Sequence, residues 1–135
     1  MKSIALAVVG GRTFRNYPLL CRSIDALRRT HRVATLISGG AEGADQLAER
    51  YAAERGLPIQ VLKPDWARVR DAGKARNSEI VARADYVIAF WNGRSAGTRD
   101  TVAKVKRAGR RKVLQVVHYE ERAFYASRAP GGNAT

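Results

Sequence analysis

The chain has 135 residues, with 25 Lys and Arg against 12 Asp and Glu, so its formal net charge at neutral pH is +13. The length fits one domain, and a hydrophobic content of 45% argues against wholesale disorder. A single Cys excludes a disulfide framework and a cysteine-based zinc cage, and the apolar runs are too short for a membrane span. We therefore expect a soluble, cytoplasmic protein with no membrane partner, whose positive charge serves nucleic acid, a small anion or solubility alone.

Short apolar runs that end at glycine or polar residues predict five strands, because strands buried on both faces of a parallel sheet are continuously apolar. The expected strands cover residues 4–9, 33–37, 59–62, 86–90 and 112–117. Apolar residues at helical spacing between these runs predict four helices. The expected helices cover residues 16–27, 44–52, 74–83 and 99–108.

The alternation of strand and helix predicts an α/β fold, in which a doubly wound parallel sheet of about five strands carries flanking helices. We expect a single domain over residues 1–118. Residues 119–135 have few apolar anchors toward their end, and we expect them to form a short or flexible tail.

The segments after the first four expected strands are 10–13, 38–45, 63–66 and 93–98, and all except 63–66 are rich in glycine, hydroxyl residues or arginine. The carboxyl ends of parallel strands share one edge of the sheet, and such sheets bind ligands there. Segments 38–45 and 93–98 each lead a glycine-rich loop into a helix start, where free N–H groups and the helix dipole attract phosphate. The sequence matches neither a P-loop nor a dinucleotide fingerprint. Together the segments predict a phosphate-bearing ligand such as a nucleotide.

The candidate ligand-binding residues come from these segments and from the start of the third helix. They are Gly10, Gly11, Arg12, Thr13, Ser38, Gly39, Gly40, Gly43, Ala44, Asp45, Asp65, Trp66, Arg76, Asn77, Trp91, Gly93, Ser95, Gly97 and Thr98.

Several of these candidates keep two interpretations. Asp45 either stabilises the helix dipole or contacts a ribose and orders the glycine loop. Arg76 is either a phosphate clamp or a surface arginine, and Trp66 and Trp91 either stack on a base or cover the core. No cluster resembles a metal site, so we expect no metal.

Six motifs together resemble the YspA-like branch of the SLOG superfamily: Gly10-Gly11-Arg12-Thr13-Phe14, the segment Ile37–Ala48, Asp65-Trp66, Ala72-Gly73-x-x-Arg76-Asn77, Ala84-Asp85 and the segment Phe90–Thr98. The resemblance covers about residues 4–117. It implies a Rossmann-like fold and a nucleotide or nucleotide-derivative ligand, such as an ADP-ribose-like molecule or a nucleoside phosphate. Related SLOG proteins are often dimers or larger, so the resemblance also implies a homo-oligomer. The branch is common in bacteria and their phages.

The leading hypothesis is a nucleotide-binding protein, with a role as a sensor as one interpretation. In this hypothesis Arg12 and Arg76 clamp charge, and Asp45 contacts the sugar or orders its loop. The residues expected to hold phosphate are Gly39, Gly40, Gly43, Gly97 and Thr98.

Another hypothesis is enzymatic. The Lonely-Guy phosphoribohydrolases of the same superfamily resemble this chain at Gly97-Thr98 and at Arg76, but Thr101 stands where they have Glu. A carboxylate stabilises the oxocarbenium-like centre of N-glycosidic cleavage and a hydroxyl does not. Asp100 is adjacent to Thr101, but one helical step turns its side chain by about 100°, so Asp100 replaces the glutamate only if the helix start is shifted. The candidate catalytic residues are therefore Arg76 and Asp100.

The second hypothesis, ahead of the enzymatic one, is nucleic-acid binding, as in the DNA-processing protein Smf of the same superfamily. Segments 12–32 and 99–112 carry most of the excess positive charge. The cations expected at such a surface are Arg28, Arg29, Lys104, Arg107, Arg110 and Arg111. Because Lys104 and Arg107 project opposite Val102 and Val105, we expect both to be exposed to solvent.

Overall fold

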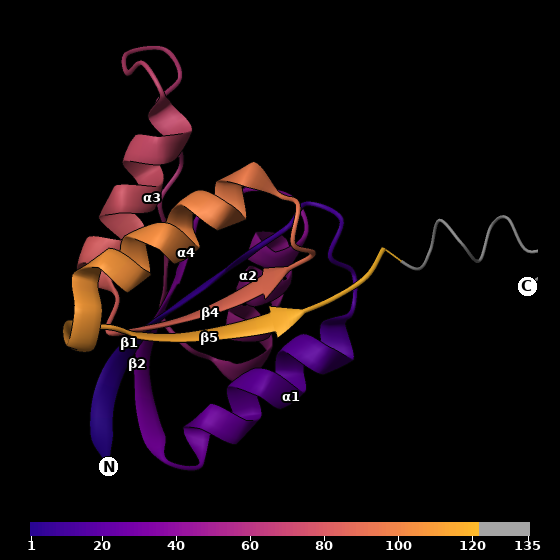
Figure 1. Ribbon diagram of the computed structural model, residues 1–135. Helices are drawn as coiled ribbons and strands as arrows, with labels where there is room; N and C mark the ends of the chain where they lie inside the picture. Colours follow the sequence, from indigo (N-terminus) through magenta and orange to yellow (C-terminus); the bar gives the residue numbers. More distant parts are fainter. Residues whose placement is uncertain (122–135) are drawn as a thin grey trace, which may run out of the picture.

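Strands and helices alternate along residues 1–121, which are the residues described by the computed structural model (Figure 1). In chain order the elements are β1 (Lys2–Gly10), α1 (Tyr17–Arg28), β2 (His31–Ser38), α2 (Ala44–Arg55), β3 (Ile59–Val61), α3 (Ala72–Arg83), β4 (Tyr86–Trp91), α4 (Ala96–Ala108), the short 3₁₀ helix η1 (Gly109–Arg111) and β5 (Val113–His118). Every strand and helix expected from the sequence is present, and most boundaries lie within a few residues of their expected positions.

The strands of the described residues form one sheet in the order β3-β2-β1-β4-β5, and every pair is parallel. The prediction of a doubly wound, Rossmann-like α/β fold is therefore confirmed. The chain winds outward from β1 to β3 and then returns to the centre, so that β4 pairs with β1 on its other side. At this reversal the loops after β1 and β4 diverge, which opens a crevice at the carboxyl edge of the sheet.

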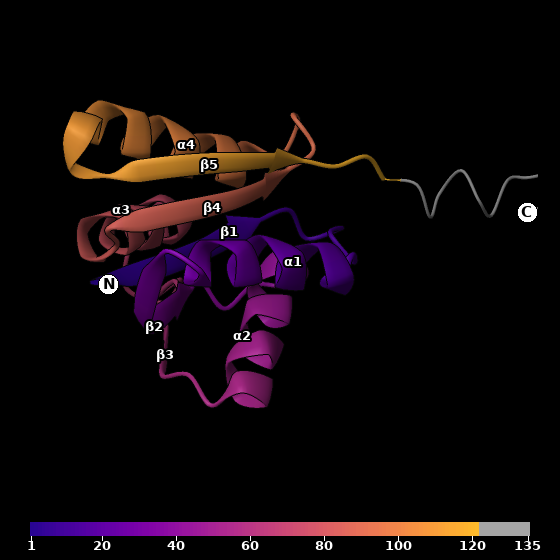
Figure 2. The ribbon, with the colours of Figure 1, turned by 90° about the horizontal axis from the view of Figure 1, so that it is seen from below.

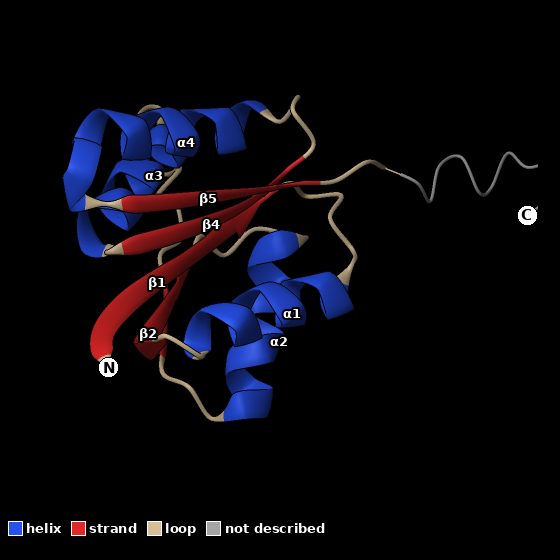
Figure 3. Cartoon of the chain, turned by 60° about the horizontal axis from the view of Figure 1, so that its bottom comes forward, coloured by secondary structure: helices blue, strands red, loops and turns tan. Residues whose placement is uncertain are grey.

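Two helix layers cover the sheet, as Figures 2 and 3 show: α1 and α2 lie on one face, and α3 and α4 on the other. Alternate residues of β1 point into the two cores. Leu6 and Val8 join the core beneath α1 and α2, while Ala7 and Val9 join the core beneath α3 and α4. This burial on both faces explains why the strands are continuously apolar.

Side chains cap two of the helices. Asn16 Oδ1 accepts a hydrogen bond from the Leu19 N–H at 3.1 Å and starts α1. Ser95 Oγ accepts from the Thr98 N–H at 3.4 Å and starts α4 at Ala96, three residues earlier than expected. Gly97 and Thr98 therefore lie in the first turn of α4 instead of in the preceding loop, because the cap precedes them.

After β5 the chain continues beyond the carboxyl end of the sheet, where Tyr119 contacts the β1–α1 loop (Figure 1). The Tyr119 N–H donates to the Trp91 carbonyl at 3.1 Å, and the Tyr119 ring packs edge-on against Phe14 with the centroids 5.0 Å apart. The Tyr119 hydroxyl and Thr13 Oγ1 share a hydrogen bond of 2.8 Å. Of the expected tail, residues 119–121 are thus held against the domain, and residues 122–135 lie outside the described residues.

Candidate functional site

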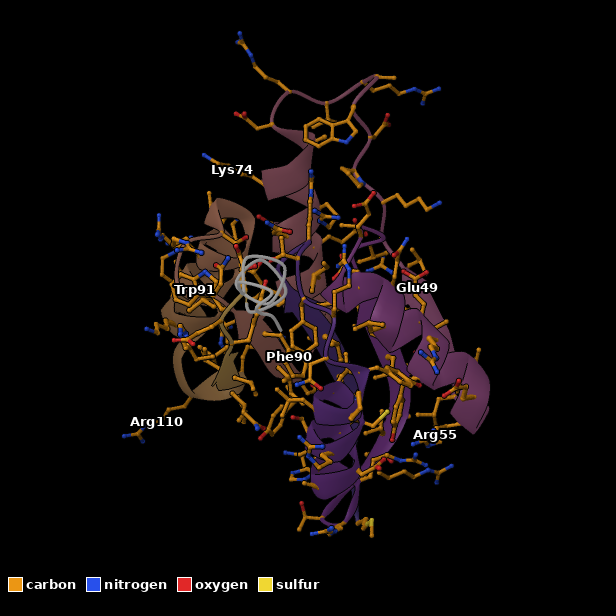
Figure 4. The ribbon with its side chains drawn as sticks, turned by 90° about the vertical axis from the view of Figure 1, so that its right-hand side faces the viewer. Glu49, Arg55, Lys74, Phe90, Trp91 and Arg110 are labelled. Carbon is orange, nitrogen blue, oxygen red and sulfur yellow. The ribbon has the colours of Figure 1, made fainter. Side chains whose placement is uncertain are left out.

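A cavity of about 400 Å³ opens at the carboxyl edge of the sheet, in the range of small-molecule sites. Figure 4 looks onto this edge, with Phe90 of β4 near the middle, Trp91 toward α4 and Glu49 on α2. Candidate residues that line the cavity are Gly10, Gly11, Arg12, Thr13, Gly39, Asp45, Arg76, Asn77, Ser95, Gly97 and Thr98. The shared edge thus brings together residues from three of the four expected segments and from α3.

The backbone of Gly11 joins three parts of this edge. Its N–H donates to the Phe90 carbonyl at 3.0 Å, and its carbonyl accepts from the N–H groups of Phe14 at 3.2 Å and Ala44 at 3.3 Å. The first N–H of α2 is therefore occupied by the protein itself. Gly43, which precedes α2 with φ +80°, allows this approach, because a Cβ there would lie 2.3 Å from the Gly11 carbonyl oxygen.

Asp45 holds the β2–α2 loop. Its side chain is buried, and Oδ2 accepts a hydrogen bond from the Ala41 N–H at 3.0 Å. Burial raises the pKa of Asp45 to about 6, although the Ala41 N–H and the charge of Arg76 oppose this rise. The contact matches the interpretation that Asp45 orders the glycine loop, while contact with a sugar stays a prediction.

Ser38 lies behind this loop and outside the cavity lining. Its hydroxyl donates to Glu49 Oε2 at 2.8 Å and accepts from the Gly40 N–H at 3.1 Å. Ser38 therefore shapes the loop that carries Gly39, and its hydroxyl is already engaged on the α2 side.

The Arg76 side chain extends from α3 to the β2–α2 loop. Its Nη1 donates to the Gly39 carbonyl, and its Nε donates to Asn77 Oδ1 at 2.9 Å. Partial burial lowers the pKa of Arg76, the charge of Asp45 raises it and the charge of Arg12 lowers it again. Arg12 and Arg76 thus repel each other across one cavity, and an anion between them would relieve that repulsion.

Asp100, a candidate catalytic residue, is outside the cavity lining. Its Oδ2 accepts from Asn77 Nδ2 at 3.1 Å and from Lys104 Nζ at 2.7 Å. Burial raises its pKa, but these two hydrogen bonds outweigh burial and hold the pKa below its usual range. Thr101, at the position where the related hydrolases have Glu, does line the cavity.

Lys104 was expected on a solvent-exposed face, and that expectation is wrong. Its side chain is only 17% exposed, because its ammonium group bridges Asp100 on α4 and the Lys74 carbonyl on α3, at 2.8 Å from the latter. Lys104 therefore ties the two helices together.

The two tryptophans lie outside the cavity lining. Trp66 is 68% exposed, on the loop between β3 and α3. Trp91 donates from Nε1 to the Ser95 carbonyl at 3.1 Å, and the Arg99 guanidinium lies 5.9 Å from its ring centroid. Trp91 thus supports the start of α4. Other candidates outside the lining are Gly40, Gly43, Ala44, Asp65 and Gly93.

The sequence interpretation missed Glu121, Asn92 and Thr101, which line the cavity. Glu121 follows β5, so the rule that carboxyl ends share one edge, applied to the fifth strand as well, would have found it. Its Oε1 accepts from Asn92 Nδ2 at 2.5 Å and from Thr13 Oγ1 at 3.1 Å, and Arg94 Nη2 lies 3.3 Å from its Oε2. The hydrogen bonds from Asn92 and Thr13, with the charge of Arg94, lower the pKa of Glu121.

A doubly wound parallel sheet with an arginine-bearing cavity at its central crevice defines a Rossmann-like α/β protein with a carboxyl-edge site. The family model of the YspA, cpYpsA-related SLOG family matches residues 4–69. Gene 61 protein of Mycobacterium phage D29 is 33% identical over 110 residues, which covers 76% of this chain and 88% of that protein. The chain belongs to the YspA, cpYpsA-related SLOG family, so the resemblance identified in the sequence is confirmed.

Two classes of feature are missing from the part of the chain that the structure describes. Within residues 1–121, His, Cys, Asp and Glu side chains form no cluster of three suited to a metal ion. Over the same residues, the helices lack the combined length and apolar character that crossing a membrane requires.

Proposed function

We propose that this protein binds a nucleotide or nucleotide derivative, of the ADP-ribose or nucleoside phosphate type, in the cavity at the carboxyl edge. The observation that carries the proposal is that Arg12, Arg76 and the first turn of α4 line one cavity of about 400 Å³. Membership of the SLOG family independently suggests a nucleotide-related ligand.

We assign the phosphate to the start of α4. Gly97 and Thr98 lie in its first turn, where helix N–H groups and the positive end of the helix dipole favour an anion. At the start of α2 the Ala44 N–H already donates to Gly11 and the Ala41 N–H to Asp45, while at the start of α4 the Thr98 N–H donates to Ser95 Oγ. The choice of α4 rests on the cavity lining, which includes Gly97 and Thr98 but not Gly43 or Ala44. The two glycine-rich loops therefore have different roles, and the β2–α2 loop forms a wall of the cavity.

A ligand panel tests this proposal. Protein freed of copurifying small molecules is titrated with AMP, ADP and ADP-ribose while its Tm is followed. Bound ligand stabilises the folded state, so at least one of these ligands should raise the Tm.

Arg76→Ala should abolish most of that rise, because it removes a partly desolvated cation from the cavity. Arg68→Ala is the matched control, since Arg68 is an exposed arginine of the β3–α3 loop outside the cavity lining. Absence of any rise across the panel contradicts the proposal, and equal rises in the two variants contradict the role of Arg76.

The second candidate is nucleic-acid binding at the opposite edge of the sheet. Arg28 ends α1 and Arg29 follows it, just before β2, while Arg110 and Arg111 lie in η1 just before β5. Both groups therefore lie at the amino edge of the parallel sheet, away from the cavity (Figure 1). Arg29, Arg110 and Arg111 are exposed, as is Arg107 at the end of α4, which suits contact with a phosphate backbone.

Fluorescence anisotropy with a labelled DNA duplex, at several salt concentrations, tests this candidate. Arg110→Glu with Arg111→Glu should weaken binding and flatten the dependence of log K on log salt. The same change in net charge at Arg68 and Arg70, on the exposed β3–α3 loop, is the control. Equal losses in both double variants contradict a specific amino-edge surface and indicate a response to net charge alone.

N-glycosidic hydrolysis receives less support. A hydroxyl, that of Thr101, lines the cavity at the position of the hydrolase glutamate, and Asp100 is engaged with Asn77 and Lys104. Release of free adenine from AMP that is lost in Arg76→Ala would favour hydrolysis over binding.

A further inference from the structure

The segment Tyr119–Glu121, which we name the strap, connects the end of β5 to two loops of the cavity. Tyr119 contacts Phe14 and Thr13 in the β1–α1 loop. Glu121 contacts the same Thr13 and, in the β4–α4 loop, Asn92 and Arg94. The strap therefore bridges the two loops that diverge at the crevice, and Glu121 lines the cavity between them.

The partners of Glu121 resemble those of a bound anion. An amide N–H, a hydroxyl and a guanidinium converge on one carboxylate, and this donor set also suits a phosphate group. The same Asn92 side chain accepts, through Oδ1, from the N–H groups of Arg94 at 2.8 Å and Ser95 at 2.9 Å. Asn92, which donates to Glu121, thus also stabilises the turn that precedes α4.

We propose that Glu121 is an internal competitor for the anionic ligand, and that a phosphate-bearing ligand binds by displacing it and releasing the strap. The inference rests on the proposed function, because it concerns regulation of the same cavity. Glu121 and the start of α4 line the same cavity, and Asn92, which donates to Glu121, also accepts from the Ser95 N–H just before α4. A phosphate at the start of α4 would therefore lie beside the Glu121 carboxylate and repel it, so ligand binding and the strap contacts oppose each other.

Displacement of Glu121 also affects the contacts of Tyr119. Thr13 Oγ1 forms hydrogen bonds with both the Glu121 carboxylate and the Tyr119 hydroxyl. When the carboxylate leaves, the Thr13 hydroxyl loses one of the two contacts that orient it toward Tyr119. The end of β5 thereby responds to occupancy of the cavity. This coupling supplies an output for the sensor interpretation of the site.

Calorimetric titration of the full chain with inorganic phosphate and with AMP, at constant ionic strength, tests the competition. Glu121→Gln keeps the size of the side chain and removes its charge, so both probes should bind roughly three- to fivefold more tightly than to the wild type. Glu120→Gln is the matched control, because it removes the same charge from the neighbouring residue, which does not line the cavity. Affinity for both probes should change little in the control.

Hydrogen exchange of the wild-type chain supplies a readout that needs no variant. Saturation with AMP should speed exchange of the Tyr119 N–H, which bonds the Trp91 carbonyl in the closed strap. Slower exchange, or weaker AMP binding to Glu121→Gln with unchanged phosphate binding, overturns the proposal and makes Glu121 a direct ligand contact. If neither probe binds wild type or variant and ADP and ADP-ribose also fail to bind, the proposed function itself fails; if only ADP or ADP-ribose binds the wild type, that ligand replaces AMP in the same comparison. If AMP binds the wild type but Glu121→Gln binds no more tightly, only the competition fails.

Discussion

A buried carboxyl group, Asp45, stands at the wall of the cavity and makes the domain sensitive to pH. Its pKa of about 6 in the folded protein exceeds the unfolded value near 3.9. The folded state therefore holds this proton more tightly than the unfolded chain does. The stabilisation that results is full below about pH 4 and is lost as the pH rises through about 6.

Asp45→Asn should remove this dependence, since an amide oxygen still accepts from the Ala41 N–H but carries no charge. Relative to the wild type, the variant should gain on the order of 2 kcal/mol in unfolding free energy between pH 4 and pH 7. Urea denaturation at a series of pH values measures this difference. Parallel pH curves for the two proteins would show that Asp45 is ionised without penalty.

The pH dependence of the Asp45→Asn variant must be compared with that of the wild type, because other carboxylates change the unfolding free energy with pH in the opposite direction. The pKa values of Asp100 and Glu121 are lowered in the folded state. The stability that these two groups contribute is present above their unfolded pKa values and is lost as the pH falls. Subtracting the wild-type curve removes both contributions and leaves that of Asp45.

Among the elements, α1 and α4 begin in the same way but at different places. Asn16 caps α1 on the β1–α1 loop, whereas Ser95 caps α4 inside the cavity lining. A cap of either kind satisfies an N–H group that the helix leaves without an intrahelical partner. The two caps are therefore equivalent for stability and different for ligand binding.

Asn16→Ala and Ser95→Ala should each cost about 1 kcal/mol of unfolding free energy. Only Ser95→Ala should also weaken the binding of AMP, because it loosens the first turn of α4, where we assign the phosphate. Denaturation and calorimetric titration of both variants check the two expectations. An equal loss of affinity in both would mean that binding follows global stability and not the geometry of α4.

In the whole molecule, the charges divide between the two edges of the sheet. The cavity at the carboxyl edge combines Arg12 and Arg76 with Asp45 and Glu121, so its cations and carboxylates are mixed. The amino edge gathers the exposed Arg29, just after α1, and the exposed Arg110 and Arg111 of η1, within a chain of net charge +13. A homo-oligomer, implied by the family, stays a prediction that light scattering can decide.

Because like charges repel at the amino edge, Arg110→Glu with Arg111→Glu should raise the Tm at low ionic strength, by about 2 °C. Added salt should shrink the difference, since screening weakens interactions between exposed charges. Thermal unfolding at low and high salt measures the effect. A lower Tm in the variant at low salt would mean that these arginines stabilise the fold through contacts of their own.

The sequence by itself determined the order of the elements, the parallel sheet and the edge at which the cavity lies. Apolar runs such as 4–9 and 86–90 identify buried strands, and parallel connections place every following loop on one edge. It also identified Arg76 and Gly97 as candidates, because both stand where helices begin at that edge. These conclusions need only local periodicity and one rule of topology.

Only the tertiary structure decided which of those loop residues face the cavity. The sequence places Ser38, Asp100 and Trp66 close to the ends of strands or the starts of helices at the carboxyl edge. In the structure, however, Ser38 bonds Glu49, Asp100 bonds Asn77 and Lys104, and Trp66 lies on an exposed loop. Glu121 reaches Thr13 from 108 positions along the chain. Such contacts depend on hydrogen-bond partners that the fold brings together, and no local pattern encodes them.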